Sequence, residues 1–116
     1  LEKNRRNAAI FDEKLKNVEG IQLLQNNSKC KSAYWLYTIR VLNGKKQEFM
    51  DKMKEANIMT SQVHNRNDIN SCVKEFEEIL PNIDIIEKEL VCIPVGWWLE
   101  EKDMEYIIKT IVEILK

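Results

Sequence analysis

The sequence predicts an α+β fold, in which a small, mainly antiparallel sheet carries helices packed on one face. Two observations lead to this prediction. Segments with helical spacing alternate with short strand-forming segments, in the order helix, strands, helix, strand, one or two helices, strand, helix. The clearest strand, 33–42, ends at Asn43-Gly44, which is a strong turn signal.

The first helix is predicted over residues 2–17, where charged residues surround one narrow apolar face. That face consists of Ala8, Phe11 and Leu15. Gly20 is expected to end the helix, because glycine takes the left-handed C-terminal conformation without steric cost. The apolar run 21–24 then predicts a short strand.

Segment 33–42 is predicted as a strand because aromatic and β-branched residues dominate it. Because side chains alternate along a strand, one set is expected on the buried face. It consists of Trp35, Tyr37, Ile39 and Val41. Arg40, on the opposite face, is open to two interpretations, a ligand contact or an ion-paired edge residue. A second helix is predicted over 46–57, with one apolar stripe. The stripe consists of Phe49, Met50, Met53 and Ala56.

The second half of the chain contains shorter elements. Residues 58–63 alternate weakly and are a candidate strand, and 67–80 suggests a short helix. Pro81 suits the first position of a further helix, because its missing amide hydrogen costs nothing there. The apolar side of that helix is expected to consist of Ile83, Ile86 and Leu90. A strand at 91–93 and a broad-faced helix at 101–116 complete the pattern.

Length and composition indicate a single domain over residues 1–116, in a cytoplasmic setting. The net charge of −1 and the mixing of lysines with glutamates argue against nucleic acid as a partner. No apolar run is long enough for a membrane span. The three cysteines are widely spaced, which fits reduced thiols better than a disulfide framework or a zinc site. Because the chain opens at Leu1 and already in helical pattern, we expect a piece of a longer protein.

The polar stretch 60–68 is the candidate functional segment. It contains His64, the single histidine, followed by Asn65, Arg66 and Asn67. Loops held by a rigid scaffold often carry binding groups. The alternative is a solvated connection whose Asn and Asp side chains cap a following helix. No phosphate-binding glycine loop, metal-ligand spacing or nucleophile motif occurs, so the residues by themselves predict no catalytic site.

Three sets of motifs resemble the C-terminal domain of the DegT/DnrJ-type aminotransferases. The first is the opening helix, with Asn4–Ala8 and Phe11–Leu15, followed by a short apolar strand. The second is Ala33–Tyr37, a following helix and Asn57–Ser61, where Asn57 stands at a position usually held by glycine.

The third set follows the order of the family's His-containing loop, Leu-Pro helix start, strand ending in Ile-Pro and acidic helix start. It consists of Val63-His64, Leu80-Pro81, Val91–Val95 and Leu99–Asp103. Glu100 replaces the usual Thr cap of the last helix. The correspondence covers essentially the whole chain.

The resemblance implies the C-terminal small domain of a longer enzyme of PLP fold type I, usually a homodimer. Such enzymes mostly transaminate a nucleotide-linked keto-sugar, for sugar or cell-surface polysaccharide biosynthesis, although some relatives dehydrate instead. The cofactor would be pyridoxal 5′-phosphate, and its lysine and main contacts would lie in a large domain upstream of Leu1. The present chain would cover the active-site cleft and be inactive alone.

The resemblance also assigns His64 to substrate binding, because the matching loop of the family approaches the sugar nucleotide. We extend this hypothesis to Asn65, Arg66 and Asn67, since Arg suits phosphate or carboxylate and Asn suits sugar hydroxyls. Asn65 departs from the family pattern, in which an aromatic residue usually follows this histidine. Trp97 and Trp98 are expected either to line the cleft or to pack. The competing function is a stand-alone α+β binding or regulatory module whose ligand loop is 60–68.

Overall fold

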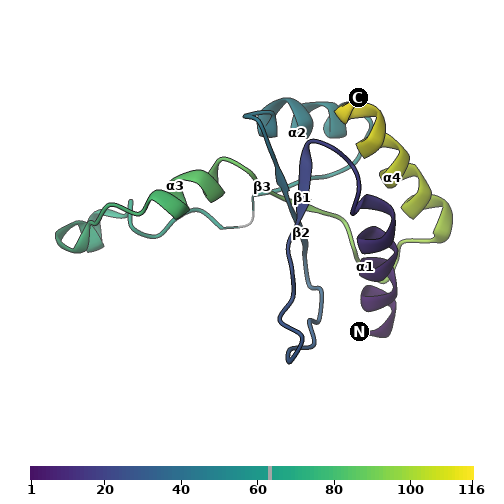
Figure 1. Cartoon of the computed structure of the whole chain (residues 1–116), viewed down its shortest axis with the longest axis horizontal. Helices are drawn as coiled ribbons and strands as arrows, with labels where there is room; N and C mark the ends of the chain where they lie inside the picture. The colour runs from purple at the N-terminus through teal and green to yellow at the C-terminus, as the bar shows by residue number, and fades with distance from the viewer. Residues whose placement is uncertain (63) are drawn as a thin grey trace.

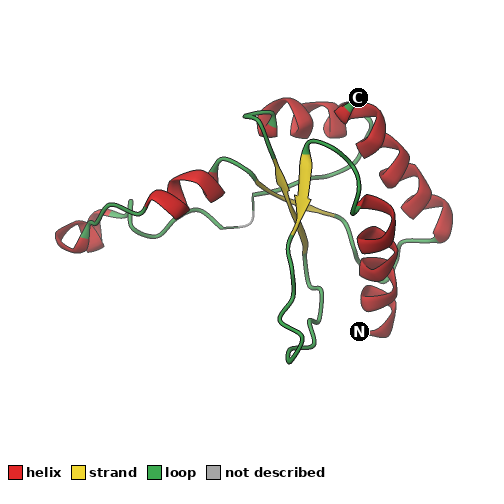
Figure 2. Cartoon of the chain, in the orientation of Figure 1, coloured by secondary structure: helices red, strands yellow, loops and turns green. Residues whose placement is uncertain are grey.

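The computed structural model describes residues 1–62 and 64–116 and confirms the α+β class. Its elements lie along the chain in an order close to the predicted one (Figures 1 and 2). They are α1 (Glu2–Leu15), β1 (Ile21–Leu23), β2 (Tyr37–Val41), α2 (Lys46–Glu55), the 3-10 helix η1 (Ser71–Phe76), α3 (Pro81–Glu87), β3 (Leu90–Ile93) and α4 (Glu101–Leu115). None of the helices in the described ranges is long and apolar enough to cross a membrane.

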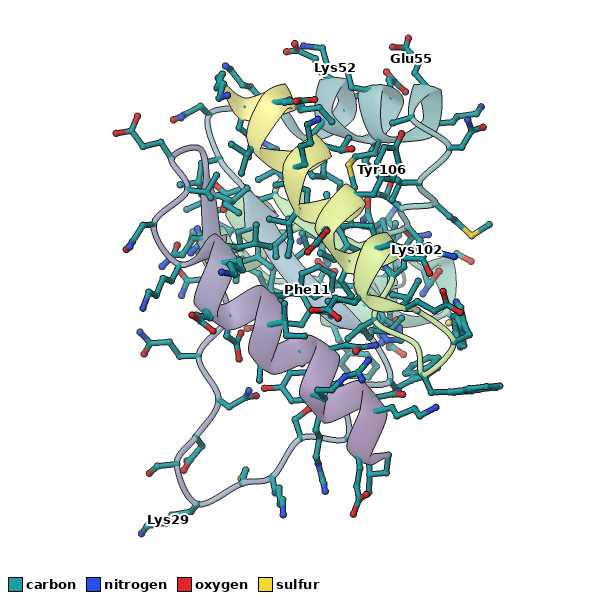
Figure 3. The ribbon with its side chains drawn as sticks, turned by 90° about the vertical axis from the view of Figure 1, so that its right-hand side faces the viewer. Phe11, Lys29, Lys52, Glu55, Lys102 and Tyr106 are labelled. Atoms are coloured by element: carbon teal, nitrogen blue, oxygen red, sulfur yellow. The ribbon has the colours of Figure 1, made fainter. Side chains whose placement is uncertain are left out.

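The strands form an antiparallel sheet in the order β1-β2-β3, with β2 in the centre. Ile21 pairs with Val41 at one edge, and Tyr37 pairs with Ile93 at the other. Helices α1, α2 and α4 lie over one face of this sheet, as the view from the helical side shows (Figure 3). The predicted arrangement of helices on one face is therefore confirmed.

The hydrophobic core lies between that helical layer and the sheet. Each element contributes side chains at its own period, three or four apart in α1 and two apart in β2. Fully buried core residues include Phe11, Leu15, Ile39, Val41, Phe49, Met53, Val91, Met104 and Ile111. Because deleting such a side chain costs several kcal/mol, on the order of 2–5, this layer holds the domain together.

Asn7 is a buried polar side chain in the same layer, and the sequence pattern did not reveal it. Its Nδ2 donates to the carbonyl oxygens of Val95 (3.3 Å) and Gly96 (3.0 Å). Its Oδ1 accepts from the guanidinium of Arg6 at 3.0 Å. These bonds satisfy Asn7 and join α1 to the turn that leads from β3 into α4.

Residues 64–89 form an arm that extends away from the three packed helices (Figure 1). The arm contains η1 and α3, and neither helix has a buried residue. It accounts for the elongated outline of the domain, 49 × 33 × 23 Å. The exposed large apolar side chains of the arm are Ile69, Phe76, Ile79, Ile83 and Ile85. The prediction that Leu90 belongs to the apolar side of α3 was wrong, because α3 ends at Glu87 and Leu90 begins β3.

The central strand is shorter than predicted, and Trp35 is exposed rather than buried. Tyr34 has a positive φ of 47°, which breaks the extended conformation just before Trp35. Alternation then resumes at Tyr37, which is buried as expected. Gly20 also has a positive φ, but it lies in the turn before β1, because α1 already ends at Leu15.

The weak strand predicted over 58–63 is reduced to one bridge. Ser61 pairs with Cys92 on the outer edge of β3, through hydrogen bonds of 3.1 and 2.8 Å. Val63 lies outside the described residues. The bridge nevertheless fixes where the chain leaves the sheet to begin the arm.

Asn57 ends α2 in a left-handed conformation, with φ 58°. Its amide donates to the Lys54 carbonyl at 2.9 Å, and the Ile58 amide donates to the Met53 carbonyl at 2.8 Å. This pair of bonds is a Schellman motif, in which the left-handed position favours glycine and then asparagine. The departure from glycine at Asn57 is therefore compatible with the same backbone.

We expect Asn57→Ala to lower the free energy of unfolding by about 1 kcal/mol, because a Cβ-bearing residue without a short polar side chain tolerates this conformation poorly. Asn57→Gly should not lower it, since glycine carries no steric penalty there. Urea unfolding of the two variants and the parent measures both changes. Equal stability of the Ala and Gly variants would contradict the explanation.

Candidate functional site

The predicted site residues lie where the chain leaves the sheet and enters the arm. His64 and Asn65 are both exposed. The bridge between Ser61 and Cys92 anchors the chain just before them, on the outer edge of β3. The site is therefore carried by a strand edge, which is a rigid support for a loop.

His64 has an aromatic neighbour that the sequence did not predict. The ring centroids of His64 and Trp35 are 6.5 Å apart, and the rings are tilted by 57°. Trp35 is 74% exposed, so its indole is accessible beside the imidazole. The structure thus brings together residues from the segment before β2 and the start of the arm.

The position of Trp35 is set by hydrogen bonds to its neighbour, Tyr34. The Tyr34 carbonyl accepts from Asn4 Nδ2 at 3.1 Å, and the Tyr34 amide donates to Ser32 Oγ at 3.1 Å. Arg5 Nε donates to the Ser32 carbonyl at 2.8 Å. Two residues of α1 therefore hold the loop in which the left-handed Tyr34 turns Trp35 away from the core.

Arg66 is held by carboxylates of the arm. Its guanidinium makes ion pairs with Asp68 and Asp84, and its Nη1 lies 3.6 Å from Glu87 Oε2. Only 15% of the side chain is exposed. The Arg66 guanidinium holds the pKa of Asp68 below its usual value, chiefly through their hydrogen bond. Arg66 therefore braces α3 against the start of the arm.

Asn67 begins the turn into η1, where its carbonyl accepts from the amide of Asn70 at 3.2 Å and from Asn70 Nδ2 at 3.0 Å. The first residue of η1 is not capped by a side-chain hydrogen bond. Asp68, the other candidate cap in this stretch, is engaged with Arg66 instead. The stretch therefore acts as a braced loop and not as a helix cap.

Lys46 joins the other end of the arm to the core. Its Nζ donates to Gln62 Oε1 at 2.5 Å and to the carbonyl of Glu87 at 2.7 Å. Burial lowers the pKa of Lys46, while the Glu87 charge acts in the opposite direction. A cation at the last turn of α3 also complements the helix dipole. The first residue of α2 thus fixes the end of α3.

Arg40, which was open to two interpretations, is ion-paired. Its Nη2 lies 2.6 Å from Glu89 Oε2, and its Nη1 donates to Gln22 Oε1 at 2.8 Å.

Trp97 and Trp98 pack edge to face, with centroids 6.0 Å apart, and both remain exposed.

Two surface hollows flank Ile58 and Met59. One, of about 510 Å³, follows the end of α2, and the other, of about 410 Å³, lies between α2 and α4 near Tyr106. Tyr106 reaches from α4 towards the end of α2, where its hydroxyl donates to the Ala56 carbonyl at 3.1 Å (Figure 3). Neither hollow is lined by His64 or Trp35. The described side chains also contain no cluster of three or more His, Cys, Asp or Glu residues arranged to hold a metal ion.

Solved structures place this fold within the aminotransferases. The chain is 35% identical to the sugar aminotransferase CalS13 from Micromonospora echinospora, with a TM-score of 0.91. It is 37% identical to AtS13 from Actinomadura melliaura, with a TM-score of 0.90. Each match covers 97% of this chain and 30% of the other. The PLP form of the putative sugar aminotransferase Spr1654 from Streptococcus pneumoniae shares the fold at 15% identity, over 97% of this chain and 30% of that one, with a TM-score of 0.83.

The model of the DegT/DnrJ/EryC1/StrS aminotransferase family matches residues 1–112, and the chain belongs to this family. It spans about 30% of the length of the solved relatives. No protein with a curated description matches it. The resemblance seen in the motifs of the sequence is therefore confirmed.

We expect the pKa of Asp68 to rise towards the value of a free Asp in Arg66→Gln, because the guanidinium that lowers it is removed. The folded-state pKa of Asp68 lies below the unfolded one, so the ion pair stabilises the fold above about pH 4. That contribution is lost as the pH falls through the lower, folded value. Carboxyl-carbon NMR titration measures the shift.

Lys102→Gln is a matched control, because Lys102 forms an ion pair outside the arm. Its Nζ lies 2.9 Å from Glu100 Oε2. This variant should leave the Asp68 titration unchanged. An Asp68 pKa that stays low without the Arg66 guanidinium would show that the ion pair does not cause the shift.

Proposed function

We propose that residues 1–116 are the C-terminal small domain of a PLP-dependent aminotransferase that acts on a nucleotide-linked keto-sugar. The observation that carries the proposal is the match along 97% of this chain to about 30% of two aminotransferases at 35% and 37% identity. The description of CalS13 as a sugar aminotransferase supports the sugar substrate. The PLP form of Spr1654 supports the cofactor.

The described residues do not themselves fit a PLP site. Lys46 combines partial burial with a lowered pKa, as a lysine that binds a carbonyl needs. Its Nζ is occupied by Gln62 and by the Glu87 carbonyl. In this proposal the lysine and the phosphate contacts lie in a large domain outside this chain, and the cofactor supplies the electron sink of transamination there.

The role proposed for this domain is to cover the active-site cleft and to contribute substrate contacts. His64 is exposed in the loop that follows the Ser61 bridge to β3, and it can exchange hydrogen bonds with a bound sugar nucleotide. Asn65 and Asn67 are exposed beside it and suit sugar hydroxyls. Arg66 contributes mainly by bracing this loop, because its guanidinium is already paired with carboxylates.

The exposed apolar side chains of the arm support further protein contacts in the full-length enzyme. Ile79 is 92% exposed and Phe76 is 72% exposed, on an arm without a core of its own. Clustered apolar surface of this kind is typical of interaction sites. We propose that it is covered by the large domain or by the second subunit of a homodimer. The cytoplasm suits the exposed thiols of Cys30 and Cys72, which stay reduced there.

The proposal is tested by adding PLP to the full-length protein and recording its absorption spectrum. A borohydride-reducible band near the visible edge is expected, together with amino transfer to a nucleotide-linked keto-sugar. A full-length protein without this band would contradict the proposal and favour the stand-alone binding module.

We expect His64→Ala in the full-length protein to lower kcat/KM about tenfold or more, because a hydrogen bond to bound substrate is lost. The cofactor band should remain, since its lysine lies elsewhere. Glu77→Ala is a control on the same arm, where the side chain is exposed. Unchanged kinetics in His64→Ala would remove His64 from the substrate site.

A further inference from the structure

Trp35 and His64 lie side by side on the surface, and the family match does not say what this pair of rings does. We propose that the two rings form a platform for the nucleobase of the nucleotide-linked substrate, with Trp35 as the stacking surface and His64 as the polar contact. This inference rests on the proposed function and adds the part of the substrate that the domain recognises. The platform consists of Trp35 and His64 alone.

The exposure of Trp35 is the first observation behind the platform. An indole that is 74% exposed contributes little to the core, yet it lies beside the single histidine, with ring centroids 6.5 Å apart. The two residues come from separate elements, so the pairing follows from the fold and not from local sequence. The tilt of 57° shows that the two rings are not stacked on each other.

The second observation is that hydrogen bonds fix the backbone from which Trp35 projects. Tyr34 takes a left-handed conformation that Asn4 and Ser32 stabilise through hydrogen bonds of 3.1 Å each. A left-handed conformation is unfavourable for a residue with a large side chain, so the surrounding bonds must maintain it. A stacking surface that is ordered before the ligand arrives loses less entropy on binding.

The charges near the platform favour a neutral ring over a phosphate. Arg66, two residues beyond His64, is bound to Asp68 and Asp84 and lies 3.6 Å from Glu87. Its positive charge is therefore largely compensated, and the loop offers no free guanidinium to a diphosphate. Aromatic stacking, by contrast, accepts any base, because every base has a π face. A nucleobase fits the indole and the imidazole better than the phosphate part of the substrate.

The test uses the full-length protein and three simple probes: UDP, ADP and inorganic pyrophosphate, which lacks a base. Calorimetry on Trp35→Ala should show UDP and ADP bound about 5- to 150-fold more weakly, the range measured for loss of one base stack. Pyrophosphate binding should not change. Trp35→Phe should recover most of the affinity, because phenylalanine restores an aromatic face.

Trp97→Ala is the matched control, since Trp97 is also exposed, at 62%, and lies outside the platform. It should leave the binding of all three probes unchanged. Wild-type affinity for UDP and ADP in Trp35→Ala would overturn the platform. So would an equal loss for pyrophosphate, or a parent protein that binds neither nucleotide. Thermal melting of each variant checks that the fold is retained.

The cofactor band of the same preparations separates this inference from the proposed function. A base-dependent effect at Trp35 without a cofactor band would keep the nucleotide platform and reject the aminotransferase. A cofactor band with no effect at Trp35 would keep the aminotransferase and reject the platform.

Discussion

The start of β2 at Tyr37 is the constraint on which the rest of the structure depends. Because β2 pairs with β1 on one side and β3 on the other, its register decides which side chains of the sheet face the helices. Tyr37 packs against Phe11 with ring centroids 5.0 Å apart, while the left-handed Tyr34 breaks the extended path and leaves Trp35 outside the core. The Tyr37 hydroxyl donates to Asp12 at 2.6 Å, and burial together with this carboxylate raises the pKa of Tyr37. The backbone conformation between Tyr34 and Tyr37 therefore affects both the core and the candidate site.

The arm is positioned by polar bonds and not by packing. Its helices bury no residue, whereas Lys46 ties the end of α3 to α2, and Arg66 ties the first turn of α3 to the loop after His64. Ion pairs near the surface are weak singly and are screened by salt. The arm is thus expected to open more readily than the core, in the way that substrate-contacting segments often do. Bracing at both ends still limits the positions available to His64.

Apolar spacing in the sequence predicts α1, α2 and α4 well, because each buries a stripe such as Phe49 and Met53 against the sheet. It fails where the backbone departs from regular geometry. The left-handed Tyr34 has no sequence signal, since tyrosine is not a residue that favours positive φ. The predicted loop at His64 came from a resemblance between motifs, but its contact with Trp35 depends on tertiary structure. The departure from Thr at Glu100 is compatible with the helix start, since its amide donates to the Asp103 carboxylate at 2.9 Å within a capping box.

The candidate site is one wall and not an enclosed cavity. His64 and Trp35 lie on an exposed edge, and the hollows around Met59 are lined by other residues. Small-molecule sites usually bury most of their ligand, so the proposed function requires a second wall from another part of the full-length protein. In the proposed function the cofactor lysine lies outside this domain. Substitutions in this domain would then change which substrate is held without changing the chemistry at the cofactor. Under the proposals made above, substitutions at Trp35 and around His64 would change substrate choice.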